Sequence, residues 1–295
     1  MPAWAEASVP RPEPGREPAV KKSRRHALGQ HFLVQPGLLQ KIVRVIDPRA
    51  DELILEVGPG RGALTALLAE KAGRVVGVEK DGRLIPILQS RNFPRTTILQ
   101  ADILTADWAR LLRAEATAFP RAKLAGNIPY AISSPLLAKV LEAKSLFVRC
   151  VFLLQKEFAE RLAAGPGTKR YAPLSILVQR GFEVKRHFAV SPGAFVPPPQ
   201  VESEVVSLIP RAVPSDPVDD EALWTAFLRA SFHQRRKTLS NNLESFGLPR
   251  DALQAAFAAR GLPAKVRAEE LTSGEFAALF KILRAAFPAN VPVPE

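Results

Sequence analysis

Between residues 53 and 190 the chain alternates between short apolar runs of strand length and longer stretches with helical periodicity. The strand-like runs cover 53–57, 74–79, 96–99, 123–125 and 147–154, and the helical stretches cover 63–72, 81–90 and 135–142. This alternation predicts an α/β fold in which helices cover both faces of a mainly parallel sheet. Two later strand-like runs, 182–190 and 201–209, are joined by a proline-rich segment, and we expect them to form an antiparallel pair at the edge of the sheet.

The sequence changes character near residue 213, where a linker rich in Pro and Asp leads into stretches with helical periodicity alone. The expected helices cover 222–232, 237–246, 250–259 and 274–287, separated by glycine and proline. We therefore predict an α/β domain over residues 27–212 and a small all-helical domain over 213–288. Residues 1–26 contain many prolines and few large apolar side chains, so we expect a disordered tail there and a frayed end over 289–295.

The chain is strongly basic, with a formal net charge of +12 at pH 7. An excess of cations fits a polyanionic partner such as nucleic acid, although a basic surface also serves solubility. The single cysteine, Cys150, has apolar neighbours and is expected to be a buried strand thiol, and the scattered histidines lack zinc spacing. No apolar run is long enough to cross a membrane, and the first residues lack a signal-peptide core. We expect a cytoplasmic protein with no structural metal, membrane contact or evident obligate protein partner.

A glycine-rich loop, Glu56–Ala63, follows the first strand and opens the first helix. Glycines at 58 and 60 allow the backbone to approach a ligand closely, because a Cβ atom would block it. Glu79 ends the next strand, about 20 residues further on, where a carboxylate can accept both hydroxyls of a ribose. This spacing fits NAD as well as S-adenosylmethionine.

Three features favour the methyl donor over NAD. Pro59 lies within the loop and Glu56 lies two residues before Gly58, as is typical of methyltransferase loops. Asp102 closes the third strand, where its carboxylate could accept from an adenine amino group or serve as a helix N-cap. No arrangement suited to hydride transfer follows downstream. The loop by itself leaves both cofactors open.

The tetrad Asn127-Ile128-Pro129-Tyr130 follows the fourth strand, at the sheet edge where α/β proteins bind ligands. The exocyclic amine of adenine is a poor nucleophile because its lone pair is delocalised into the ring. The Asn127 amide oxygen and the Ile128 carbonyl can accept its two hydrogens and draw the nitrogen towards tetrahedral geometry. Pro129 stiffens the loop, and Tyr130 offers a face on which a base can stack. The tetrad therefore indicates methylation of an amine on a planar base.

Six motifs in order make the chain resemble the ribosomal RNA adenine dimethyltransferase family from about Leu28 to Phe287. The motifs are Gly29–Leu33, Glu56–Gly60, Asn127–Tyr130, Leu154–Glu157, Phe195–Ser203 and Gln234–Thr238. The resemblance implies a Rossmann-like class I methyltransferase sheet, an S-adenosyl-L-methionine cofactor and a small all-helical C-terminal domain. Ile128 departs from the Leu that is more common in small-subunit members and matches the large-subunit resistance enzymes.

The resemblance also implies roles for matched positions. The implied cofactor-binding residues are His31, Leu33, Gly58, Gly60, Glu79, Asp102, Ile103 and Asn127. In this assignment Gly58 lines the methionine end, Glu79 holds the ribose and Asp102 holds the adenine. The implied catalytic residues are Asn127, Ile128, Pro129, Tyr130 and Phe195. Asn127 orients the target amine, while Tyr130 and Phe195 flank the base; without the resemblance, Phe195 would be taken as a core aromatic.

Two basic clusters are candidate phosphate contacts. Arg235, Arg236 and Lys237 are expected to open a helix of the small domain, and Lys169 and Arg170 follow a Gly-Pro-Gly loop. Both could equally be solvated surface charge.

By the family resemblance, the predicted activity is dimethylation of the N6 amines of two adjacent adenines near the 3′ end of small-subunit (16S) rRNA, on a partly assembled 30S precursor particle. Three alternatives remain open from the sequence. They are a large-subunit (23S) rRNA adenine methyltransferase, a non-catalytic ribosome-assembly or nucleic-acid-binding factor of the same fold, and an NAD-dependent oxidoreductase.

Overall fold

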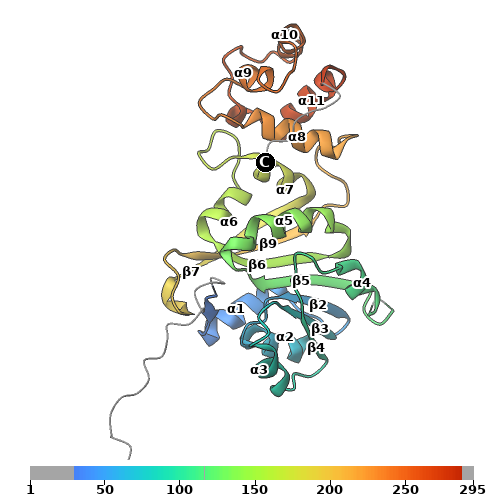
Figure 1. The fold of residues 1–295 in the computed structure, drawn as a ribbon, viewed down its shortest axis with the longest axis vertical. Coiled ribbons are helices and arrows are strands. Elements are labelled where there is room, and N and C mark those ends of the chain that lie inside the picture. The colour runs from blue at the N-terminus through green and yellow to red at the C-terminus, as the bar shows by residue number, and fades with distance from the viewer. Residues whose placement is uncertain (1–29, 116, 288–295) are drawn as a thin grey trace, which may run out of the picture.

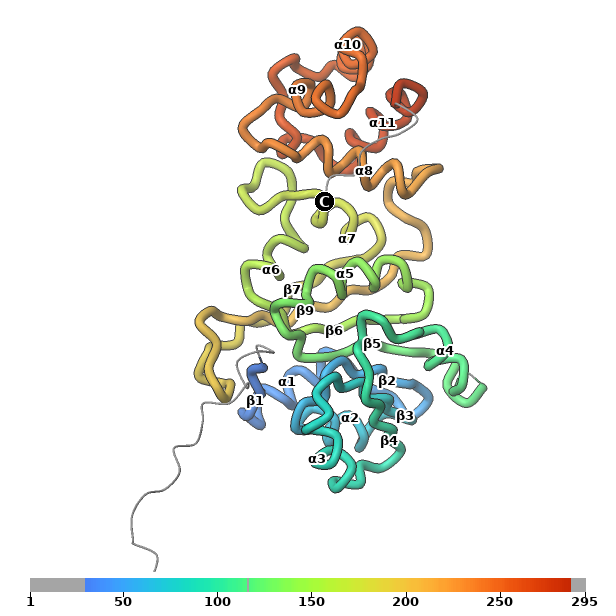
Figure 2. The backbone as a smooth tube through the Cα atoms, viewed as in Figure 1, coloured from blue at the N-terminus to red at the C-terminus, as the bar shows by residue number. Residues whose placement is uncertain are grey.

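A computed structural model describes residues 30–115 and 117–287 (Figures 1 and 2). The predicted tails, 1–26 and 289–295, lie outside the described residues. No helix among the described residues is both long and apolar enough to cross a bilayer.

The centre of the molecule is a seven-stranded sheet in the order β4-β3-β2-β5-β6-β9-β7. Its strands are β2 (Glu52–Val57), β3 (Arg74–Glu79), β4 (Thr96–Gln100), β5 (Arg121–Asn127), β6 (Arg149–Gln155), β7 (Phe182–Val190) and β9 (Ser203–Pro210). The first five are parallel, while β9 runs antiparallel to both β6 and β7. The predicted α/β sheet with an antiparallel edge pair is confirmed, and β7 forms the outer edge.

Helices cover the two faces of this sheet. On one face α1 (Pro36–Ile46) and α2 (Ala63–Lys71) enclose an apolar core with β2, β5 and β6. The opposite face is covered by α4 (Trp108–Arg113), α5 (Ser133–Glu142), α6 (Lys156–Leu162) and α7 (Pro173–Gly181). A short helix, α3 (Ile85–Ser90), connects β3 to β4. Because both faces are covered, the successive residues Ile54 and Leu55 of β2, which point to opposite faces of the sheet, are both fully buried.

The predicted buried thiol is confirmed, since Cys150 lies in β6 with no exposed surface. Burial raises the pKa of this thiol above its usual range, which suppresses the reactive thiolate.

The helical region stacks on one end of the molecule, above α7 in Figure 1. It contains α8 (Glu221–Ser231), α9 (Leu239–Glu244), α10 (Arg250–Ala259) and α11 (Ser273–Leu283). Side chains cap several of these helices, as where Asp220 accepts from the Leu223 N–H at the start of α8. The apolar core of this region also takes in Tyr171 and Ile176 from the α/β part, so the two parts share a packed boundary.

Three helix boundaries differ clearly from the expectation: α3 begins at Ile85 and not at 81, α11 ends at Leu283 and not at 287, and α9 begins later than expected. Helix α9 begins at Leu239 with Thr238 as its N-cap, so residues 235–237 lie in the turn between α8 and α9. The prediction that the basic triplet opens a helix is wrong, because the Thr238 side chain accepts from the Asn241 N–H and sets the helix start after the triplet.

Candidate active site

A cavity of about 340 Å³ opens at the carboxyl ends of β2 and β5. Its walls come from the glycine loop after β2, the tetrad after β5 and residues 30–34 near the start of the described chain. The predicted site residues that line it are His31, Leu33, Gly58, Gly60, Glu79, Asn127, Ile128, Pro129 and Tyr130. The fold therefore gathers into one cavity segments that lie almost 100 positions apart in the sequence.

The glycine loop turns through left-handed backbone conformations that favour glycine. The φ angles of Gly58 and Gly60 are +63° and +62°, and a Cβ atom on Gly60 would lie 3.0 Å from the Phe32 ring. The buried Glu79 carboxylate accepts from the Gly60 N–H over 2.9 Å and from the Asp81 N–H over 2.8 Å. Glu79 thus fixes the loop directly while also lining the cavity.

A second carboxylate, Glu56, lies on the cavity wall with 1 % of its surface exposed. Burial raises the pKa of Glu56 to about 7, and the negative charge of Glu79 adds to the rise. Its Oε2 atom has no hydrogen-bond partner among the described residues. A buried acceptor without a partner is costly, so this side of the cavity suits a ligand that carries a cationic donor.

The segment before α1 closes the cavity from another side. A two-stranded sheet pairs β1 (Phe32–Leu33) with β8 (Phe195–Val196). His31 donates from Nδ1 to the Pro197 carbonyl over 2.8 Å. The Arg61 guanidinium lies 5.1 Å from the centre of the Phe32 ring, which links this segment to the glycine loop.

The tetrad is held by contacts to both neighbouring segments. Asn127 ends β5 and donates from Nδ2 to the His31 carbonyl over 2.7 Å. The Asn127 side chain lines the cavity, and this bond orients its amide so that the Oδ1 atom remains available as an acceptor. Ile128 is buried and donates its backbone N–H to the Leu153 carbonyl, which ties the tetrad to β6.

Tyr130 stands at the start of a short 3₁₀ turn with its ring beside that of His31, at 5.8 Å between ring centres and an angle of 33°. Its hydroxyl and the Ser203 hydroxyl are hydrogen-bonded at 2.9 Å. Partial burial raises the pKa of Tyr130 above its usual range, while the Ser203 contact opposes this, so the phenol stays neutral. The site thus offers an amide acceptor and an aromatic face at one rim of the cavity.

Three predicted site residues do not line this cavity. Asp102 forms an ion pair with Lys80 at 2.8 Å and accepts from the Leu104 N–H. These two contacts lower the pKa of Asp102 below its usual range, the Lys80 contact having the larger effect. Ile103 belongs to the apolar core between the sheet and α4–α7.

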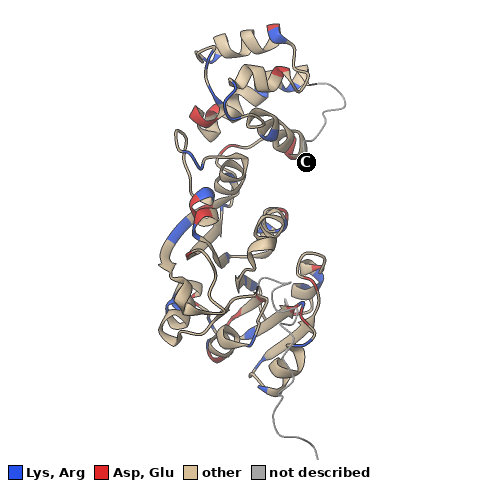
Figure 3. Cartoon of the chain, turned by 60° about the vertical axis from the view of Figure 1, so that its left-hand side comes forward, with Lys and Arg blue, Asp and Glu red and all other residues tan. Residues whose placement is uncertain are grey.

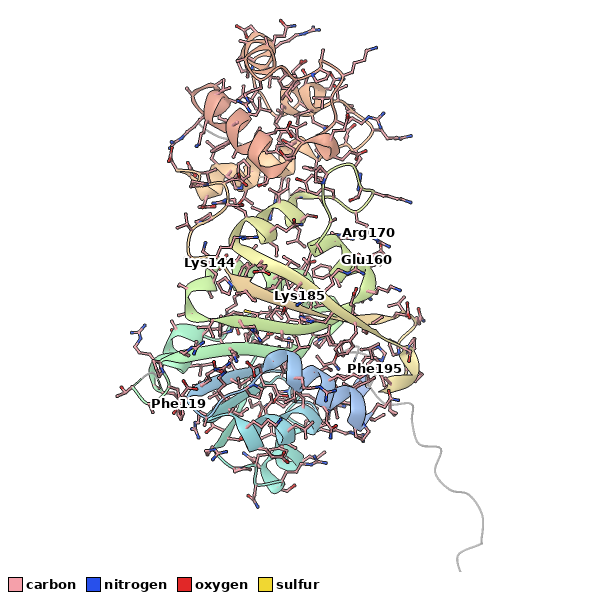
Figure 4. The ribbon with its side chains drawn as sticks, turned by 180° about the vertical axis from the view of Figure 1, so that it is seen from behind. Phe119, Lys144, Glu160, Arg170, Lys185 and Phe195 are labelled. Carbon is pink, nitrogen blue, oxygen red and sulfur yellow. The ribbon has the colours of Figure 1, made fainter. Side chains whose placement is uncertain are left out.

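Phe195 is the third such residue; it lies in β8 opposite Leu33 of β1, belongs to the apolar core on the α1 side of the sheet and has 2 % of its surface exposed (Figure 4). In this conformation it is a core aromatic. The role of Phe195 in flanking the target base stays a prediction, and this role would require the Phe195 ring to leave the core.

The two basic clusters lie side by side although 66 positions separate them. Arg235 donates to the Lys169 carbonyl over 2.6 Å and pairs with Glu269 at 2.9 Å. Arg170 pairs with Glu157 and Glu160, and Figure 4 shows it near Glu160. Only Arg236 and Lys237 of the triplet are exposed cations without an ion pair among the described residues.

Sequence reasoning missed several cavity residues. Arg61 and Arg91 line the wall, as does Leu153 of β6. Arg61 lies inside the glycine loop and could have been found there, whereas nothing local marks Arg91 or Leu153. Ser203 lay in a quoted motif, but only the fold places its hydroxyl on Tyr130.

Comparison with known proteins identifies the family. The model of the family described as ribosomal RNA adenine dimethylase matches residues 21–285. The chain belongs to this family. It is therefore a methyltransferase that acts on ribosomal RNA, and an NAD-dependent oxidoreductase is excluded.

Relatives and solved structures agree with this assignment. The ribosomal RNA small subunit methyltransferase A of Geobacter sulfurreducens is 45% identical over 266 residues, covering 89% of this chain and 96% of the relative. That of Geobacillus kaustophilus is 39% identical over 93% of this chain and 97% of the relative. The crystal structure of a dimethyladenosine transferase from Plasmodium falciparum matches with a TM-score of 0.73 at 27% identity, covering 87% of this chain and 98% of the other. The 23S rRNA methyltransferase ErmE matches with a TM-score of 0.65 at 26% identity, covering 86% and 99%.

Proposed function

We propose that this protein uses S-adenosyl-L-methionine to dimethylate the N6 amines of two adjacent adenines near the 3′ end of 16S rRNA, on a 30S precursor particle in the cytoplasm. The observation that carries the proposal is the position of Asn127. Its amide is held by the His31 carbonyl at the rim of the cavity that the glycine loop forms. The small-subunit target is supported by relatives at 38–45% identity that carry the small-subunit name.

The cavity has the chemistry that this cofactor requires. The backbone at Gly58 and Gly60 leaves room for close approach, and two carboxylates, Glu56 and Glu79, line the walls. Glu79 would hold the ribose hydroxyls and Glu56 the methionine ammonium, which supplies the partner that the Glu56 Oε2 atom lacks. When bound, the cofactor supplies a methyl group already activated by its positive sulfur.

The chain itself positions the target amine. The Asn127 Oδ1 atom and the Ile128 carbonyl accept the two hydrogens of N6, so that the nitrogen lone pair is freed for attack on the methyl carbon. Tyr130 stacks on the base, a contact worth about 1–3 kcal/mol. The nitrogen aligned in this way would take the methyl group that the cofactor supplies, and the methylated nitrogen would then release a proton to solvent. Because the methyl group is already activated, catalysis depends on alignment more than on a strong base.

Ribosomal RNA is the proposed macromolecular partner, and the exposed turn with Arg236 and Lys237 is its proposed contact in the helical region. Lys169 and Arg235 lie beside this turn, but Arg235 and Arg170 already pair with carboxylates. Lys169 is exposed and, like Arg236 and Lys237, makes no ion pair among the described residues, so we assign most of the phosphate affinity of this surface to these three cations.

The test is incubation of the protein with labelled methyl donor and unmethylated 30S particles, followed by mass spectrometry of the nucleosides. We expect N6,N6-dimethyladenine at two adjacent positions. Asn127→Ala should lower the rate by about 100-fold or more while leaving particle binding intact, because it removes an aligned acceptor and no phosphate contact.

Two results would contradict the proposal. Methylation of 23S RNA in place of 30S particles would move the target to the large subunit. No methylation at all, with the donor shown to bind, would indicate a non-catalytic factor of this fold.

A further inference from the structure

A second concave surface lies on the same sheet face as α1, towards the β7 edge. We call it the edge groove; its volume is about 570 Å³. It is lined by Lys41, Arg44, Val45, Arg149, Glu183, Lys185, His187, Phe188, Ser207 and Ile209. The groove exists because α1 packs on β6 and β9, and no helix of the described residues covers this face at the β7 edge beyond it (Figure 4).

The edge groove is unusually cationic for its size. Four Lys and Arg side chains and one carboxylate, Glu183, line it. None of the four cations makes an ion pair within residues 30–115 and 117–287. Their charges therefore add to one positive field over the groove.

On the opposite face of β7, by contrast, a cation is neutralised by carboxylates. Arg186, the next residue after Lys185, points to that face and pairs with Glu204 at 2.9 Å and Glu160 at 3.5 Å. Two neighbouring cations on one strand thus have opposite surroundings. Glu160 and Glu204 lie on the Arg186 side, whereas Glu183 is the one carboxylate beside the four groove cations on the Lys185 side, so that side keeps an excess of positive charge for an external anion.

The floor of the groove is polar and ordered. The His187 Nε2 atom and the Ser207 hydroxyl are hydrogen-bonded at 2.8 Å, and Arg149 donates one N–H to the Val45 carbonyl at 3.0 Å. A guanidinium carries five N–H donors, so Arg149 retains donors for a phosphate. Burial lowers the pKa of His187, and the nearby charges of Lys185 and Arg149 lower it further, in agreement with a positive field.

Helix α1 separates the edge groove from the candidate active site. Leu39 and Ile42 line the cavity of the active site, whereas Lys41 and Arg44 line the groove. Residues three apart on a helix, such as Lys41 and Arg44, lie on one face, so the two sites use opposite sides of one helix. An anion in the groove would be anchored to an element that shapes the cofactor cavity.

We propose that the edge groove binds the sugar–phosphate backbone of the substrate rRNA, as a second contact surface separate from the turn at 235–237. This inference rests on the proposed function, because it takes rRNA as the polyanion. Charge complementarity selects the backbone over the bases: the groove offers four cations with N–H donors, whereas its one Phe ring, Phe188, is half-buried with the Lys41 ammonium 6.0 Å from the ring centre.

The test compares a groove variant with a matched control of equal charge change. The groove variant is Arg44→Glu with Lys185→Glu, both at exposed positions. The control is Lys71→Glu with Arg113→Glu, which are exposed cations in the last turns of α2 and α4 and line neither site. A milder variant, Arg44→Gln with Lys185→Gln, serves if charge reversal impairs folding.

Binding to unmethylated 30S particles and to protein-free 16S rRNA is measured at several salt concentrations, with wild type alongside. We expect the groove variant to bind both about 10-fold more weakly, with a salt slope lower by about two, because each phosphate contact contributes about 0.9. The control should bind within about 2-fold of wild type.

Equal binding by the groove variant and the control would overturn the inference. Weaker binding to particles with unchanged binding to free rRNA would also overturn it, since the groove would then contact a ribosomal protein. If the wild-type protein does not methylate the particles but the groove variant still binds RNA more weakly than the control, the proposed function is overturned and the groove remains an RNA-binding site.

Discussion

The central sheet and the helical region differ in the kind of side chain that they bury. In the sheet, Glu52, Glu56, Glu79 and Lys123 are all buried, and two of these carboxylates face the candidate active site. In the helical region the core is a cluster of aromatic rings, in which Phe227 contacts rings on both α8 and α11. Its cations remain at the surface (Figure 3).

This difference shows where each region obtains its stability and its binding. A buried charge destabilises a fold unless it is paired, as Glu52 is with Lys123 at 2.6 Å. Glu56 and Glu79 have no such partner but shape a ligand cavity, whereas the helical region is stabilised mainly by apolar packing. We infer that the sheet recognises its ligand with interior groups and that the helical region recognises RNA with exposed ones. Four predictions test this contrast, in order of decreasing effect.

Removal of a core ring should destabilise the helical region without altering the cofactor site. Phe227 is fully buried, so Phe227→Ala should lower the free energy of unfolding by about 3–5 kcal/mol. Urea unfolding measures the loss, and calorimetry measures donor affinity at a temperature where the variant is folded. An equal fall in donor affinity would show that the two regions are not independent.

The buried acid Glu56 should make stability depend on pH. With its pKa near 7 in the fold and near 4.5 in the unfolded chain, Glu56 keeps a proton between these values that the unfolded chain has lost. The free energy of unfolding should therefore fall as pH rises from 4.5 to 7, by about 3 kcal/mol in total. Glu56→Gln removes this contribution, so the variant should gain on wild type across that window in donor-free unfolding experiments. A constant difference from pH 5 to pH 8 would contradict the expected burial effect.

A methyl group in the glycine loop should weaken donor binding. Gly60→Ala places a side chain in a left-handed conformation, which costs about 1–2 kcal/mol, and brings it against Phe32. We expect donor affinity to fall about 10-fold by calorimetry. Gly37→Ala in α1 is the control, because a Cβ there has no neighbour within 4 Å and donor affinity should not change. Equal donor affinities for the two variants would contradict the inference that the donor closely approaches the backbone of this loop.

Neutralisation of the exposed turn should have the smallest effect. Arg236→Ala with Lys237→Ala should weaken particle binding about 3-fold and lower the salt slope by about two. Arg260→Ala with Lys265→Ala removes two other exposed cations of the same region as a control. If the control variant loses as much affinity for the particle, binding depends on the total charge of the region and not on a contact made by this turn.

Much of the fold followed from local patterns. The apolar runs predicted all seven strands of the sheet close to their observed positions, with the starts of β6 and β9 each placed two residues early. Helices α1, α4, α6 and α7 were missed. In α1 the signal was present, since its buried positions 39, 42, 43 and 46 have helical spacing. The others have six to nine residues and depend on tertiary packing more than on propensity.

By itself the sequence determined the α/β class, the glycine loop and the tetrad at the end of β5, because periodicity and turn chemistry are local properties. It could not determine which distant groups meet. The Asn127 bond to the His31 carbonyl, the Tyr130 contact with Ser203 and the burial of Phe195 all depend on the strand order and on the β1–β8 pair. The edge groove likewise exists only because α1 stops short of β7. Tertiary structure decided these features, since each joins segments whose separation in the chain exceeds the reach of any local signal.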